Sequence, residues 1–214
     1  TMKNLTQLLL ALSLAISIPV HAEVAQQVLD DAYENYLTAV DGGKKASKET
    51  AKLFEQLNKD YPGEPGILVL YGGSQTLQGR DAWAPWKKLK FTENGLDRME
   101  KAVALLETSH REQVLGDLPL DLQVKTLTGI TYVSVPDFFN RFDQGRQLLG
   151  EVVNDQRLAD MPDQAYQYIL LYAGQAAEKD GDVEQAKQLY QRIIDGHGLT
   201  EEAEKAKAAL ANLS

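Results

Sequence analysis

The sequence predicts an all-α protein, a solenoid of about four helical hairpins that ends in a C-terminal capping helix. Three observations support this fold class. Apolar residues recur at the three-and-four spacing of a helix with one buried face along most of residues 23–214. Clusters of glycine, proline and aspartate break this pattern at short intervals, as turns between helices do. The pattern itself recurs along the chain, which is typical of helical repeats.

The chain opens with the pattern of a secretory signal peptide. Lys3 precedes the apolar run 5–20, and the small residues Val20 and Ala22 precede a plausible cleavage point. The apolar run is shorter than the ~20 residues that span a bilayer, which weighs against a retained membrane anchor. We therefore expect residues 1–22 to be removed on export and residues 23–214 to form one helical repeat domain.

Composition narrows the function classes. The net charge is −9, and such a surface repels nucleic acid and anionic lipid, which bind chiefly through clustered lysine and arginine. The chain has no cysteine, so neither a disulfide nor a cysteine-linked lipid is possible. An exported chain without cysteine fits a bacterial periplasm better than a small disulfide-stapled domain. We expect no nucleic-acid partner and no stable membrane insertion after the signal peptide is removed.

The first hairpin is predicted from the amphipathic runs 23–40 and 47–60. An Asp-Gly-Gly stretch at 41–43 ends the first run, and Tyr-Pro-Gly at 61–63 ends the second. Each run carries its apolar residues on one side, as paired helices require.

Two further pairs follow. The second joins 65–77 to 93–106 through a long intervening stretch, and the third joins 120–133 to 137–153 through Ser-Val-Pro. Both pairs repeat the helix–turn–helix pattern of the first.

The fourth pair joins 164–178 to 183–194 through a Lys-Asp-Gly-Asp turn. A last polar helix begins after Thr200, which is a good N-cap followed by acidic residues in the first turn. Its narrow apolar stripe and charged back suit a helix that covers the end of a stack.

The fourth pair resembles a tetratricopeptide repeat. Gly174, Ala186 and Tyr190 have the spacing of that family's small residue, alanine and aromatic residue. Earlier pairs match the pattern more loosely, at Phe54, Pro62, Gly72, Gly129 and Leu149. The resemblance implies a concave groove, lined by the first helices of the hairpins, that holds an extended peptide or a partner helix.

The stretch 79–91, GRDAWAPWKKLKF, departs from this pattern. In a regular repeat the alanine of the second helix would soon follow Gly72, but the best candidate, Ala102, lies much further along the chain. We therefore interpret the stretch as an insertion, and we consider two roles for it. In the first, its tryptophans fold back on the hairpin as a staple. In the second, it is a binding site for an acidic partner or anionic group, with the residues Trp83, Trp86, Lys87, Lys88 and Lys90.

A second aromatic group lies after Pro136. Phe138, Phe139 and Phe142 either seal the third hairpin or project into the concave face, and we include them among the candidate binding residues. The tyrosines fall at helical spacing, which favours positions in the core or along the groove.

No catalytic chemistry is visible. After removal of the signal peptide only His110 and His197 remain, both among polar residues, and no metal-ligand spacing or catalytic motif occurs. We expect no enzymatic activity, metal or cofactor. The leading interpretation is a periplasmic scaffold that binds a partner protein or peptide in its concave groove, as a component of an envelope or transport assembly. The alternative is a small-molecule or lipid-binding module whose pocket is closed by residues 79–91.

The signal-peptide interpretation gives a first prediction. Expressed in a bacterium with an intact export system, the protein should be recovered in soluble form with Glu23 as its first residue. N-terminal sequencing of the periplasmic fraction checks this. Full-length protein held in the membrane fraction would contradict it.

Overall fold

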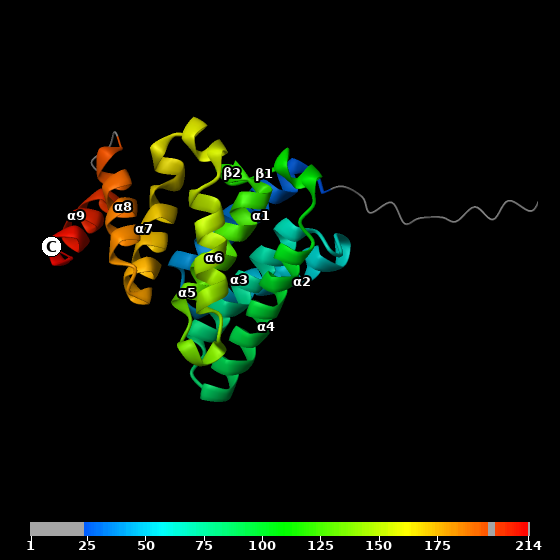
Figure 1. Ribbon diagram of the computed structural model, residues 1–214. Helices are drawn as coiled ribbons and strands as arrows, with labels where there is room; N and C mark the ends of the chain where they lie inside the picture. Colours follow the sequence, from blue (N-terminus) through cyan, green and yellow to red (C-terminus); the bar gives the residue numbers. More distant parts are fainter. Residues whose placement is uncertain (1–23, 197–199, 214) are drawn as a thin grey trace, which may run out of the picture.

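The computed structural model describes residues 24–196 and 200–213, and these residues are mainly helical (Figure 1). The helices are α1 (Gln26–Asp41), α2 (Lys44–Asp60), α3 (Pro65–Asp81), α4 (Pro85–Ala104), α5 (Leu120–Ser134), α6 (Phe142–Val153), α7 (Asp163–Asp180), α8 (Val183–Asp195) and α9 (Glu201–Asn212). The all-α prediction is confirmed. The predicted signal peptide, 1–22, lies outside the described residues.

Short elements complete the chain. Single 3-10 turns lie at Thr108–Arg111, Asp137–Phe139 and Gln156–Asp160. A two-stranded antiparallel ribbon pairs β1 (Val114–Leu115) with β2 (Leu118–Pro119) just before α5. The sequence pattern did not predict this ribbon, because strands of two residues are too short to show a period.

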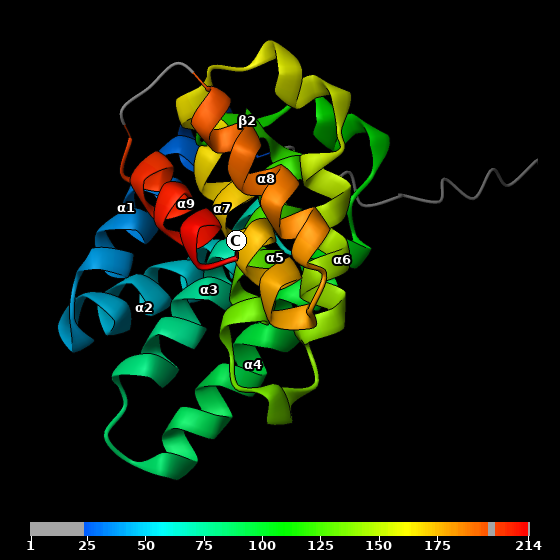
Figure 2. The same cartoon turned by 60° about the vertical axis from the view of Figure 1, so that its left-hand side comes forward.

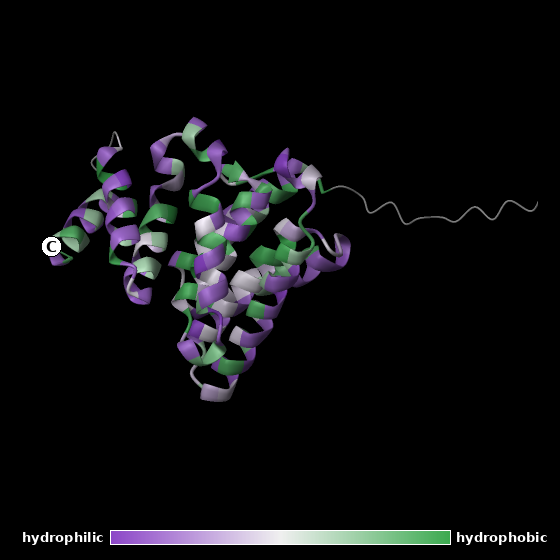
Figure 3. Ribbon diagram, viewed as in Figure 1, coloured by the Kyte–Doolittle hydropathy of each residue, from purple (hydrophilic) through white to green (hydrophobic). Residues whose placement is uncertain are grey.

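Helix α3 lies at the centre of the N-terminal half. Every residue from Pro65 to Gln75 is buried, and α1, α2, α4 and α5 all pack against this helix. Most of this stretch, PGILVLYGGS, has apolar or small residues on all sides, as a helix buried all round requires. In Figure 3 hydrophilic ribbon marks the outer surfaces at α2 and α8, and hydrophobic segments lie mainly between them.

The helices pack in chain order. Each helix contacts the next one, and α1–α3, α3–α5 and α5–α7 also contact one another across the hairpins. The buried apolar residues form two clusters, one from α1 to α5 and the other from β2 to α9. Helix α5 belongs to both, since Val124 lies in the first cluster and Leu122 in the second.

The stretch 79–91 is not an inserted loop, which corrects the sequence interpretation. Helix α3 continues to Asp81 and α4 already begins at Pro85, so the additional residues lengthen both helices. The elongated hairpin extends beyond the neighbouring helices, at the lower end of the molecule in Figures 1 and 2. We call residues 79–91 the hairpin tip.

Glycines bring α3 and α4 into backbone contact. A Cβ atom on Gly72 would lie 2.6 Å from the carbonyl oxygen of Gly95, and one on Gly95 would lie 2.5 Å from the oxygen of Gly72. Nearer the tip, a Cβ atom on Gly79 would collide with the hydroxyl of Thr92. The close neighbour of Gly72 is therefore Gly95, and Ala102 is buried further along α4.

The expected close contact in the fourth hairpin is present. Gly174 and Ala186 are both buried, and a Cβ atom on Gly174 would lie 2.5 Å from the ring of Tyr190. The hydroxyl of Tyr190 donates a hydrogen bond to the Glu178 carboxylate at 2.9 Å.

The glycine contact between α3 and α4 leads to a stability prediction. Gly72→Ala and Gly95→Ala should each lower the free energy of unfolding by about 1–3 kcal/mol, because the new methyl group meets a backbone oxygen that cannot rotate away. Chemical denaturation with circular dichroism measures this.

The matched control is Gly150→Ala in α6, where a Cβ atom would meet nothing within 4 Å. This variant should gain about 0.5–1 kcal/mol, the usual effect of replacing a glycine inside a helix. Equal effects at the three positions would contradict the close crossing.

Candidate functional site

The hairpin tip exposes both tryptophans of the chain. Trp83 is 87% exposed and Trp86 is 69% exposed, and Leu89 beside them is 42% exposed. Large apolar side chains gathered on a protruding surface mark sites of interaction more often than isolated exposed residues do. The staple interpretation is wrong, because neither indole folds back onto the hairpin.

Local geometry explains why Trp83 points outward. The backbone is extended at Ala82 and Ala84, and both alanines are buried. Side chains alternate in extended backbone, so the residue between two inward alanines faces solvent. Pro85 then occupies the first turn of α4, where its fixed φ favours helix initiation.

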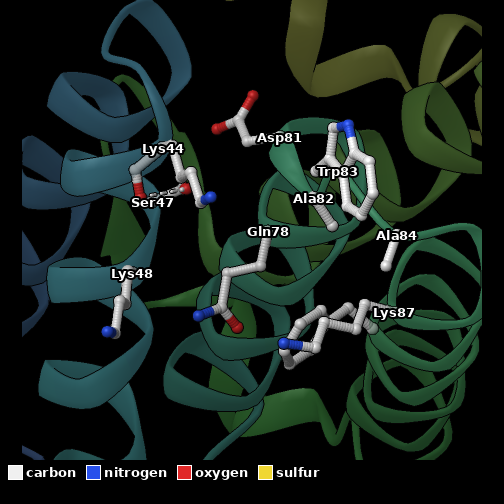
Figure 4. A pocket seen from close by; sticks show the side chains of 10 residues that line it. Lys44, Ser47, Lys48, Gln78, Asp81, Ala82, Trp83, Ala84 and Lys87 are labelled. Atoms are coloured by element: carbon white, nitrogen blue, oxygen red, sulfur yellow. Dashed lines mark hydrogen bonds between the residues drawn. The ribbon is translucent and has the colours of Figure 1, made fainter.

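A cavity of about 310 Å³ opens between the tip and the start of α2 (Figure 4). We call it the tip groove. Its lining residues are Lys44, Ser47, Lys48, Gln78, Asp81, Ala82, Trp83, Ala84, Lys87 and Phe91. Helix α2 supplies the two lysines and the serine of one bank, and the turn and α4 supply Trp83 and Lys87 across the groove. The groove thus combines aromatic surface with positive charge.

The lysines of the groove are not neutralised internally. In the part of the chain that the structure describes, no ion pair involves Lys44, Lys48 or Lys87. The carboxylate in the groove, Asp81, is bound by Arg80 at 2.8 Å, and this hydrogen bond lowers the pKa of Asp81. Helix α2 also begins without a side-chain cap or an acidic first turn, which leaves its positive end unshielded. The lining of the groove therefore carries more positive than negative charge, in a chain of net negative charge.

Arg80 fixes the position of the tip relative to α2. Its guanidinium donates to the carbonyl oxygens of Val40 at 3.0 Å and Gly42 at 3.2 Å, in the connection between α1 and α2. The same side chain binds Asp81. These bonds join the end of α3 to the residues that precede Lys44 and Lys48 in the chain.

The remaining lysines of the tip lie outside the groove. Lys88 and Lys90 are exposed on α4 and do not line the cavity, and neither does Trp86. They extend the positively charged, aromatic surface along the outside of the hairpin. The sequence named the lysines of the tip but missed Lys44 and Lys48, because their place beside the tip depends on the packing of α2 against α3.

The phenylalanines form a separate region. Phe138 is 67% exposed, and its ring lies 4.3 Å from that of Phe139, which packs against the N-terminal core cluster. Phe142 lies under the ammonium group of Lys179, 4.5 Å from its ring centre. None of the three lines the tip groove. The structure therefore does not unite the two groups of candidate residues.

Gln123 of α5 joins a tyrosine of α1 to a tyrosine of α7. The amide of Gln123 donates to the hydroxyl of Tyr33 at 3.1 Å, and its oxygen accepts from Tyr168 at 3.4 Å. Tyr36 is 7% exposed and packs its ring over Gly73. Burial raises the pKa of each of these three tyrosines. This bridge between first helices fits the predicted core or groove-lining role of the tyrosines.

Other chemistry finds little support in the described residues. Across 24–196 and 200–213 no cluster of three or more His, Asp or Glu side chains could hold a metal ion, and no helix is long and apolar enough to cross a membrane. His110 has a capping role, since its Nδ1 accepts a hydrogen bond from the backbone of Glu107 at 2.8 Å. His197 lies outside the described residues.

The exposure of the tip makes a spectroscopic prediction. The fluorescence of the native protein should resemble that of the unfolded chain, and iodide should quench it more strongly than caesium at equal ionic strength. At moderate salt, charges interact mainly within ~10 Å of one another. The lysines beside the indoles therefore affect the local concentration of iodide and caesium more than the net negative charge of the whole protein does.

Changing Lys44, Lys48, Lys87, Lys88 and Lys90 together to Gln should remove most of the difference between the two ions. Acrylamide, which is neutral, should quench the native protein and the variant equally. A blue-shifted native emission with little quenching by any agent would show that the indoles are covered.

No protein-family model, curated protein or solved structure matches the chain. The candidate site is therefore defined by its own residues: two exposed indoles, and a cavity with three unpaired lysines around it. This arrangement is suited to binding, through an apolar contact beside positive charge.

Proposed function

We propose that the protein is an exported, tetratricopeptide-like scaffold that binds a partner protein through its hairpin tip. The resemblance at Gly174, Ala186 and Tyr190 supports the repeat architecture. The packing of each helix on the next, with contacts between the first helices of successive hairpins, is in keeping with a solenoid. The signal-peptide pattern supports export to a periplasm.

The observation that carries the proposal is the exposure of Trp83 and Trp86 on a projecting hairpin. Tryptophan is the residue type most enriched among the few side chains that dominate binding energy in protein interfaces. The backbone contact between Gly72 and Gly95 holds the two helices of the hairpin together. A surface that is already ordered loses little conformational entropy when a partner binds.

The tip is a better candidate than the concave face. A peptide groove needs free surface along the first helices, whereas Tyr33 of α1 is bound by Gln123 of α5, and Tyr36 and Gln123 are buried. The groove-binding version of the scaffold stays a prediction. A non-enzymatic role is part of the proposal.

A small-ligand role is the second candidate, because the tip groove provides a cavity of about 310 Å³ beside residues 79–91. Typical ligand pockets begin at roughly this volume, but they bury most of the ligand. Trp83 at the rim of the groove is almost fully exposed, which favours a macromolecular partner.

The test is recovery of partners from a periplasmic extract of the host, with the mature protein as bait. Trp83→Ala and Trp86→Ala should each weaken binding of a stoichiometric protein partner by about 2 kcal/mol or more, as hot-spot residues do. The free energy of unfolding should change by less than about 0.5 kcal/mol, because both side chains are exposed.

Phe138→Ala is the matched control, since it removes an exposed aromatic ring at a separate place. It should leave binding unchanged. Full binding by both tryptophan variants would overturn the proposal, and a single small molecule in place of a protein would support the second candidate.

A further inference from the structure

We infer that the tip groove binds an extended acidic segment of the partner, with carboxylates on its lysines and an apolar side chain against Trp83 and Phe91. This inference rests on the proposed function, and it names the chemistry of the partner. It starts from the position of the three unpaired lysines on opposite banks of one cavity.

Charge selects an anionic occupant. Lys44, Lys48 and Lys87 line the cavity, and the only carboxylate among the lining residues, Asp81, is bound by Arg80. No internal ion pair has to break when a carboxylate reaches these lysines. The unshielded positive end of α2 acts in the same direction.

Spacing selects an extended chain. Lys44 and Lys48 are four residues apart on one face of α2, which places them about 6 Å apart along the helix axis. Alternate residues of an extended peptide lie about 6.6 Å apart on one side of the chain. Two acidic residues separated by one residue therefore match the two lysines of this bank.

The residue between the two carboxylates points to the opposite bank. Side chains of an extended peptide alternate, so this residue faces Trp83, Lys87 and Phe91. Contact with the aromatic rings favours an apolar side chain there, and Lys87 can meet a further carboxylate. The recognised pattern is thus acidic, apolar, acidic.

A membrane surface fits these observations less well. A bilayer is flat on the scale of the groove and cannot reach lysines on both of its banks. The net charge of −9 also opposes approach of the whole protein to an anionic leaflet.

The experiment is a fluorescence titration, because Trp83 and Trp86 are the only tryptophans and both lie at the tip. The probe is a short synthetic peptide that alternates aspartate and leucine. Comparison peptides alternate asparagine or lysine with leucine, and vesicles of phosphatidylglycerol and of phosphatidylcholine test the membrane alternative. The acidic peptide should shift the emission to the blue and bind more weakly as salt rises.

A charge-reversed variant locates the binding. Lys44→Glu, Lys48→Glu and Lys87→Glu together should weaken binding of the acidic peptide by about tenfold or more and improve binding of the lysine peptide. The matched control reverses the exposed lysines Lys59, Lys101 and Lys207, which do not line the groove. It should behave like the wild type, and circular dichroism should show both variants to be folded.

Three results would overturn the inference: equal binding of the asparagine peptide, no binding of the acidic peptide, or binding to vesicles alone. The proposed function fails separately. The tryptophan variants could lose their protein partner while the lysine variant retains it. The tip would then be the interface, but the lysines of the groove would not bind acidic residues of the partner.

Discussion

The backbone contact between Gly72 and Gly95 is the constraint on which the N-terminal half depends. It lets α4 approach α3 more closely than side chains would allow, and α1, α2 and α5 enclose the rest of the central helix. The same contact continues toward Gly79 and Thr92, so the two helices stay together beyond the core. The projecting tip is a direct extension of the most closely packed pair in the fold.

Much of the fold could be predicted from the sequence, because amphipathic helices show their period and turns show their glycines and prolines. The prediction failed where packing overrides that signal. The buried part of α3 has no polar face, so the periodicity does not reveal where the helix ends. The spacing of a regular repeat then made residues 79–91 look like an inserted loop, although they are the ends of two long helices and the three-residue turn between them.

The site was predicted in part. Tryptophan beside lysine is visible in the chain, and Trp83, Trp86 and Lys87 do lie together at the tip. The second bank of the groove could not be predicted, since no pattern in α2 shows which helix will lie opposite. The same holds for Asp121, whose buried carboxylate receives two hydrogen bonds from Arg157, far along the chain. Such pairs arise from tertiary packing alone.

The two core clusters meet along α5 and at the ribbon before it, where Leu115 of the first cluster pairs with Leu118 of the second, and this division bears on how the chain folds. Helices that pack mainly on their successors close short loops, so little chain entropy is lost before contacts form. All of the helices that form the cluster from α1 to α5 precede α7, α8 and α9 in the chain. A chain that emerges N-terminus first can therefore assemble this cluster, with the tip already displayed, while its C-terminal helices are still unfolded.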